Sequence, residues 1–184
     1  LTPNDKVVIR HNVKYIPDDN TTIVIINEND VLQHYRVELL ELGLLNKPIP
    51  TYKLKIFARL MGALNTDGNI TVSHDEKSNK DYYQCSFHVG EELDVYQITD
   101  DLNKLGFGQG NVEKNNTTEQ SSDLKLFNVL KEGSFAYFIH LLGGFVGDKT
   151  NMLLYIPDWL INAELSIQRE FLSGFQSGIG CKLS

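Results

Sequence analysis

Hydrophobic and polar positions follow two different periods along this chain. From residue 53 onward, stretches with apolar residues every three or four positions are interspersed with stretches in which polar and apolar residues alternate. The first period is typical of helices and the second of half-buried strands. The pattern predicts helices at 53–66, 91–105 and 134–142, and strands at 70–72, 82–89, 109–114 and 123–131.

Short polar turns join the predicted strands in pairs. Neighbouring strands with such connections form an antiparallel sheet, and the helices between the pairs must cover one of its faces. The sequence therefore predicts an α+β fold of order α-β-β-α-β-β-α. Two further helices are expected near residues 156–160 and 167–176.

The first 50 residues have a different pattern. Two short apolar runs, at 7–9 and 23–26, flank a polar turn and predict a hairpin or an edge element. Asn29 is expected to cap a helix that continues to about Leu45. The proline-containing stretch at 47–50 would end that helix and form a stiff linker. We therefore expect a first segment at 1–50 and a main domain at 51–184.

Composition narrows the class of protein. Of the 184 residues, 41% are hydrophobic and 22% are charged, which is ordinary for a soluble globular protein. No apolar run approaches the roughly 18 residues of a membrane span. Cys85 and Cys181 are too few for a disulfide framework and predict a reducing, intracellular compartment. The net charge of -7 argues against strong nucleic-acid binding, although a local basic face could coexist with it.

A ten-residue pattern occurs twice. The segment at 59–68, RLMGALNTDG, returns at 171–180 as FLSGFQSGIG. Each copy is an apolar helix with a small glycine shortly before a glycine-containing exit. The copies differ at one important place, because Asp67 in the first corresponds to Ile179 in the second.

The repeat belongs to a larger set of features. An Ile-Pro-Asp-Trp sequence at 156–159 precedes the second copy, the stretch at 100–107 reads DDLNKLGF, and the second copy is approached by REFLSGFQ at 169–176. With the predicted element order, residues 51–184 resemble a LAGLIDADG (DOD-type) homing endonuclease. The resemblance is to the kind found in inteins of large DNA viruses and microbes, here with a degenerate second motif.

The resemblance implies a fold and a chemistry. The two motif helices would pack through small residues, which are Gly62, Ala63, Ser173 and Gly174. Each helix would bring one carboxylate to a DNA-binding saddle, where Mg²⁺ prefers hard oxygen ligands and activates water. Asp67 matches the metal-binding acid of the first motif. Ile179 cannot ligate a metal, so we expect double-strand cleavage to be lost, with at most nicking of one strand.

The same resemblance suggests further site residues. Lys149 would be the active-site lysine that polarises the water, with a solvated loop lysine as an equally good interpretation. DNA would contact the concave face of the sheet. The candidates for these contacts are Thr71, Ser73, Tyr83, Gln84, Ser86, His88, Lys125 and Asn128. Any half-exposed antiparallel sheet would show this alternation, and an Asp-Gly pair such as Asp67-Gly68 also ends helices on its own.

Two functions of different classes follow. The first is a degenerate homing endonuclease, a hydrolase that acts on double-stranded DNA with Mg²⁺ if any activity survives. The second is a catalytically dead fold reused as a structural, assembly or protein-interaction component. The net charge, Ile179 and the apparent truncation of a second sheet after the second motif favour the second function. We expect no membrane partner.

Overall fold

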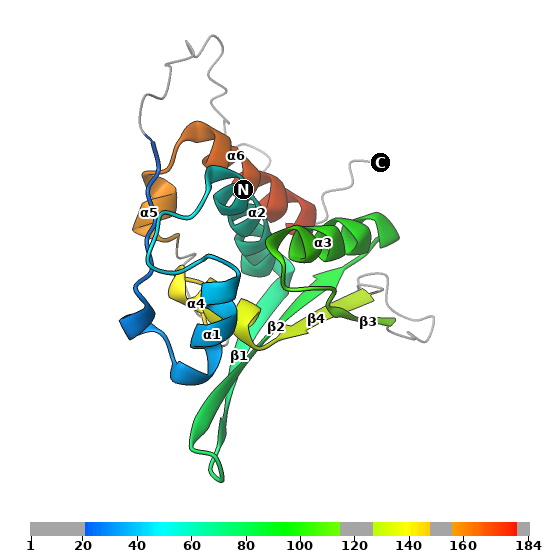
Figure 1. Ribbon diagram of the computed structural model, residues 1–184. Coiled ribbons are helices and arrows are strands. Elements are labelled where there is room, and N and C mark those ends of the chain that lie inside the picture. The colour runs from blue at the N-terminus through cyan, green and yellow to red at the C-terminus, as the bar shows by residue number, and fades with distance from the viewer. Residues whose placement is uncertain (1–20, 115–126, 148–155, 180–184) are drawn as a thin grey trace, which may run out of the picture.

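The computed structural model describes residues 21–114, 127–147 and 156–179 (Figure 1). The first elements are a 3-10 helix (Glu28–Asp30) and the helix α1 (Gln33–Glu41). The main domain then runs α2 (Thr51–Asp67), β1 (Gly68–Asp75), β2 (Lys80–Val89), α3 (Glu92–Leu105), β3 (Asn111–Lys114), β4 (Phe127–Glu132) and α4 (Ser134–Leu141). Two more helices follow, α5 (Asp158–Ile161) and α6 (Leu165–Ile179). The predicted α+β class and element order are confirmed.

The four strands form one antiparallel sheet in the order β1-β2-β4-β3. Residues directly opposite each other in an antiparallel ladder point to the same face. Ile70 faces Cys85, and Phe87 faces Val129, and all four side chains are buried. This face carries the helices, and we call it the covered face. Burial there raises the pKa of the Cys85 thiol, so this thiol is unreactive.

The opposite face of the sheet is mostly polar, and we call it the open face. Alternation along the ladders places on it residues from all four strands. They are Asn69, Thr71, Ser73, Asp75, Lys80, Tyr82, Gln84, Ser86, His88, Asn111, Glu113, Asn128, Leu130 and Glu132. Figure 1 shows the helices gathered on one side of the sheet and the hairpin of β1 and β2 extending beyond them.

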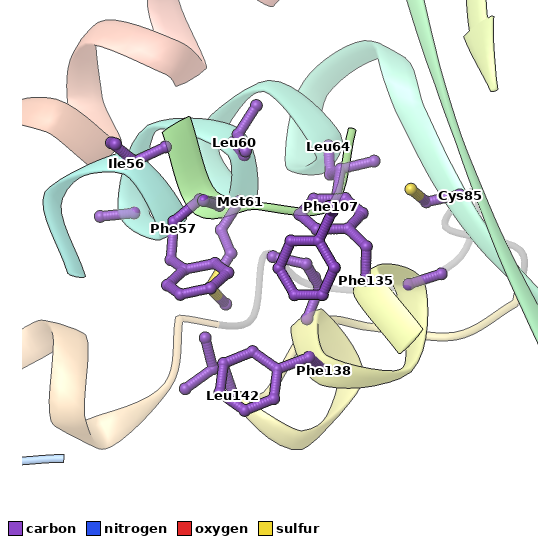
Figure 2. Close-up of a cluster of buried hydrophobic side chains, with 14 of the residues drawn as sticks. Ile56, Phe57, Leu60, Met61, Leu64, Cys85, Phe107, Phe135, Phe138 and Leu142 are labelled. Carbon is purple, nitrogen blue, oxygen red and sulfur yellow. The ribbon is translucent and has the colours of Figure 1, made fainter. Parts of the chain in front are cut away.

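Helix α2 lies at the centre of the core. Eight of its residues are buried, because the sheet, α4 and α6 all pack against it. Aromatic rings fill the space between α2 and α4 (Figure 2). The ring centres of Phe57 and Phe138 are 5.1 Å apart, and those of Phe107 and Phe135 are 5.3 Å apart. Such close aromatic packing fixes the position of α2 relative to the sheet.

The structure corrects the prediction for residues 21–50. Asn29 lies in the 3-10 helix and caps nothing, and α1 begins only at Gln33 and ends at Glu41. Gly43, with a φ of +65°, reverses the chain after α1. The strand predicted at 23–26 is an extended segment outside the sheet. It pairs locally, because the Asn46 amide donates to the Ile26 carbonyl at 2.8 Å. The other half of the predicted hairpin lies outside the described residues.

The linker predicted at 47–50 lies within a continuous core. Val24, Leu39, Leu44 and Ile49 are buried in the same hydrophobic cluster as the side chains of α2. A smaller correction concerns α4. Gly133 occupies its cap position, and Ser134 is its first residue. In the ranges that the structure describes, no helix is long and apolar enough to cross a membrane.

Tyr35 anchors α1 to the sheet. Its hydroxyl donates to the Asp81 carbonyl at 3.3 Å and accepts from the Tyr83 amide at 3.2 Å. Its ring stacks on Tyr137, with 4.9 Å between centres, and the Tyr137 hydroxyl accepts from the Leu32 amide at 3.0 Å. Burial raises the pKa of Tyr35, which keeps its hydroxyl protonated as a donor.

Replacing Tyr35→Phe should lower the free energy of unfolding by about 1–3 kcal/mol, because the Tyr83 amide and Asp81 carbonyl lose a shared buried partner. Urea denaturation followed by circular dichroism measures this change. Tyr52→Phe is the matched control, since Tyr52 is 58% exposed and should leave the midpoint unchanged. Equal stability of both variants would contradict an anchoring role for Tyr35.

Candidate active site at the paired motif helices

The two copies of the repeated motif pack directly against each other. Gly62 of α2 lies so close to α6 that a Cβ atom would overlap the Phe171 carbonyl oxygen and approach the Phe175 amide to 2.7 Å. Gly174 of α6 meets α2 in the same way, against the Arg59 carbonyl and 3.1 Å from the Ala63 amide. Only glycine allows two helix backbones to come so near. Figure 1 shows α2 and α6 side by side above the sheet.

These contacts are reciprocal. Each glycine touches the carbonyl three residues before the glycine of the other helix, and the amide one residue after it. This is the pattern of an isologous, two-fold contact, here formed within one chain. The last residues of the two helices, Asp67 and Ile179, each stand five positions after their glycine. The two-fold relation therefore makes Asp67 and Ile179 equivalent positions.

Three of the four predicted interface residues lie at this contact. They are Gly62, Ala63 and Gly174. The prediction for Ser173 is wrong, because its side chain is exposed to solvent. Ser173 and Gly174 are neighbours in sequence, but successive helical residues differ in direction by about 100°, and here Gly174 faces α2 while Ser173 faces solvent.

Gly174→Ala should lower the free energy of unfolding by about 3 kcal/mol, the upper end of overpacking costs, because the new methyl group meets rigid backbone. Thermal and urea denaturation report the loss. Ser173→Ala should change stability by less than about 0.5 kcal/mol, since its side chain is exposed. A Gly174→Ala protein as stable as Ser173→Ala would show that the helices are not in backbone contact.

A charged network joins three helices beside this contact. The Arg59 guanidinium of α2 makes a bidentate pair with Asp101 of α3, at 2.8 and 2.6 Å, and also pairs with Glu170 of α6. Asp101 is fully buried and also accepts from the Gln97 amide at 3.1 Å. The hydrogen bonds from Arg59 to Asp101, and the nearby Glu170, raise the pKa of Arg59 further above its ordinary value. The sequence did not predict this network, although Asp101 belongs to the DDLNKLGF stretch at 100–107.

Asp101→Asn should destabilise the protein by about 3 kcal/mol, because it leaves the partly buried Arg59 charge with only Glu170 as its acidic partner. The adjacent Asp100 gives a matched control. Asp100 is half exposed and pairs with Lys104 on the same helix, so Asp100→Asn should cost less than about 1 kcal/mol. Denaturation midpoints compare the two variants, and equal midpoints would contradict the importance of the network.

Asp67 lies where the helix pair meets the sheet. It is the last residue of α2, is half-buried, and directly precedes Gly68, whose ladder partner is Phe87. The loop after α4 approaches the same edge, because the Gly147 amide donates to the Ile70 carbonyl of β1 at 3.0 Å. Lys149 follows two residues later but lies outside the described residues. Gly147 thus contacts a strand residue three positions after Asp67.

The donor atoms near Asp67 suit a hard cation only in part. Asp67 supplies a carboxylate, and magnesium is commonly held by one or two carboxylates together with substrate phosphates. The equivalent position on α6 is a hydrocarbon, Ile179. Across the described ranges no group of three or more histidine, cysteine, aspartate or glutamate side chains is placed to hold a metal. Of the two equivalent helix ends, that of α2 carries a carboxylate of the kind hard cations use, and that of α6 does not.

Most of the predicted DNA-contact residues share the open face. Thr71, Ser73, Gln84, Ser86, His88 and Asn128 lie there. The prediction for Tyr83 is wrong, because Tyr83 points to the covered face and stacks on His140, with ring centres 5.3 Å apart. A one-residue change of position along a strand moves a side chain to the opposite face. Lys125 lies outside the described residues.

The polar groups of the open face are partly bonded to one another. The Ser86 hydroxyl donates to the Asn69 side-chain oxygen, and Gln84 donates to Glu132 at 3.2 Å. The side-chain oxygen of Asn128 is buried and has no hydrogen-bond partner. Asn69 was not among the predicted contact residues. It follows Asp67 by two positions, and residues two positions apart along a strand lie on the same face, which here is the open face.

The open face is not basic where it is described. Its strand residues include one lysine, Lys80, against three acids, Asp75, Glu113 and Glu132. Two other strand lysines face the covered side. Lys131 donates to the Phe107 carbonyl at 2.6 Å, and the Lys114 ammonium lies 5.8 Å from the centre of the Phe127 ring. The local basic face that strong phosphate binding would require is absent from these strands.

Comparison with known proteins gives two similar chains. One is the tRNA-splicing ligase RtcB of Methanocaldococcus jannaschii, 27% identical over 172 residues, which cover 86% of this chain and 17% of the ligase. Another is the DNA-directed RNA polymerase subunit Rpo1N of the same organism, 25% identical over 196 residues, covering 95% of this chain and 14% of the subunit. The chain thus spans less than a fifth of either relative. No protein-family model matches the chain.

Proposed function

We propose that this chain is a degenerate LAGLIDADG-type homing endonuclease domain that binds double-stranded DNA and cleaves at most one strand. The observation that supports it best is the reciprocal packing of α2 and α6 through Gly62 and Gly174. This contact makes the helix ends Asp67 and Ile179 equivalent positions, and Asp67 directly precedes the first strand of an antiparallel sheet with one open face. A two-fold arrangement of helix ends suits a substrate with two-fold backbone symmetry, such as duplex DNA.

Magnesium would be held by the Asp67 carboxylate together with phosphate oxygens of the DNA. When bound, the ion would activate water and neutralise charge at the scissile phosphate. The protein's own residues position the substrate, because the open face receives the duplex and the helix pair fixes the Asp67 backbone. Ile179 offers no ligand on the other side of the two-fold relation. Cleavage of the second strand is therefore expected to fail.

The two relatives support an origin as an inserted element. Nearly the whole chain aligns within a ligase and within a polymerase subunit, whose names describe unrelated activities. A segment that occurs in two such hosts is independent of either host's reaction.

A second function is favoured by a different observation. The described open face has three acids and one lysine, and Ile179 replaces the second metal acid. A fold that no longer binds phosphate would tolerate both features. The chain would then serve as a structural or protein-interaction component and would bind neither DNA nor magnesium.

Nicking of supercoiled plasmid that carries a selected target tests the endonuclease proposal. With Mg²⁺, the protein should convert supercoiled DNA to the open-circular form and should produce little linear DNA. Asp67→Asn should abolish nicking, because it removes the charged ligand of the metal. Asp75→Asn, which removes an acid at the far end of the same face, should retain it.

Ile179→Asp adds the missing acid and should increase the linear product, because both strands could then be cut. Absence of any nicking together with absence of DNA binding at low salt would favour the structural function. Nicking that survives Asp67→Asn would contradict the assignment of Asp67 and point to a contaminating nuclease.

A further inference from the structure

We infer that a cavity between α2, α3 and α6 binds a small organic cation with an apolar body, such as a protonated aromatic amidine. The cavity lies beside the contact of the paired helices, where Figure 1 shows the C-terminal half of α6 reaching toward α3. Its walls come from these three helices and from the end of β2. The inference concerns a site that the proposed nuclease function does not use.

The size of the cavity limits the ligand to a small molecule. The space between its atoms is about 450 Å³ with the open mouth included, and about 40 Å³ of it is available to the centres of water molecules. The inner part therefore holds about three waters. This room suits a compact polar group inside and one ring in the mouth. Five apolar side chains of the lining would contact the ring, which are Leu60, Ala63, Phe87, Val89 and Ile98.

Acids outnumber cations around the cavity. The lining residues that the structure describes include two acids, Asp94 and Asp101, and one cation, Arg59. Arg59 also pairs with Glu170, so two carboxylates already match its single charge. Negative charge is therefore in excess at the cavity. Asp101 is fully buried, and charges in such a place are screened by salt much less than charges on the surface. A cationic ligand is favoured over an anionic one.

The hydrogen-bonding groups of the lining favour a ligand that donates. All three nitrogen atoms of the Arg59 side chain already donate to carboxylates. The Gln97 side-chain nitrogen donates to Asp101 at 3.1 Å, which leaves the amide oxygen to accept. The Ser177 hydroxyl donates to the Gly174 carbonyl at 2.9 Å, so its oxygen is left to accept as well. The groups that remain for a ligand are therefore mainly acceptors.

Size, charge and acceptors together define the class of ligand. A protonated aromatic amidine carries a planar group of N–H donors with a positive charge, attached to one apolar ring. The donor group would occupy the inner part of the cavity near Asp101, and the ring would lie against the apolar side chains. Hydrogen bonds from a charged donor are stronger than those between neutral groups. A neutral amide of the same shape should therefore bind less well.

Benzamidine, which is protonated at neutral pH, is the probe, and benzamide and benzoate are its neutral and anionic counterparts. Titration of the isotopically labelled full chain, followed by amide chemical shifts, measures the affinity for each compound. Benzamidine should bind about tenfold more tightly than benzamide, and benzoate should not bind. Asp94→Asn should weaken benzamidine binding about tenfold, because it removes an acid of the lining. Asp100→Asn is the matched control, since Asp100 lies outside the cavity and pairs with Lys104.

A second pair of variants tests the location of the site. Ser177→Phe places a ring at the cavity and should abolish benzamidine binding, whereas Gln176→Phe makes a similar change at an exposed position outside the lining and should preserve it. Benzamide or benzoate that binds as tightly as benzamidine would overturn the inference. So would benzamidine that does not bind, that binds equally to the Asp94→Asn and Asp100→Asn proteins, or that still binds to Ser177→Phe. Circular dichroism of each variant checks that the fold is unchanged.

Discussion

The contact on which the rest of this structure depends is the backbone-to-backbone approach of α2 and α6. Gly62 and Gly174 permit it, and any larger residue at either place would push the helices apart. Because α2 is also the helix on which the sheet and α4 pack, its position sets where β1 begins. The end of α2 and the first residue of β1 are consecutive, so the helix contact determines the location of Asp67 directly. The same two glycines therefore determine both the packing of α2 and the location of the candidate site.

The sequence predicted the main domain well because its signals there are local. Alternation in β2 and the apolar period of α2 each indicate one structure, and the polar turns leave little choice of pairing. Residues 21–50 were predicted less well, because their structure depends on distant partners. The segment at 23–26 has strand-like composition, but its backbone pairs with residues 46–49 and not with the sheet. Leu32 precedes α1 without a capping side chain, and its amide is satisfied by Tyr137, more than one hundred residues away.

In the candidate site, too, the residues with a local sequence signal were predicted and those that depend on distant partners were not. Asp67, Gly62 and Gly174 could be found from the repeat, because equal spacing from glycine to helix end is visible in the sequence. Ser173 and Tyr83 were misplaced because each is one residue from a position that faces the right way, and the sequence alone does not fix the rotation of a helix or the register of a strand. The partners of Arg59 come from two other helices, and no local pattern links Asp101 with Glu170.

The Arg59 network also makes the helix pair unequal. By the two-fold relation, the counterpart of Glu170 on α2 is Ala58, and the counterpart of Arg59 on α6 is Phe171. A second copy of α2 could offer a glycine at the contact, but it would present a methyl group where Arg59 now finds a carboxylate. The charge of Arg59 on α2 thus distinguishes α6 from a second copy of α2, although both offer a glycine at the contact. The Arg59–Glu170 pair thus favours the packing of α2 on α6 over the packing of α2 on a second copy of α2.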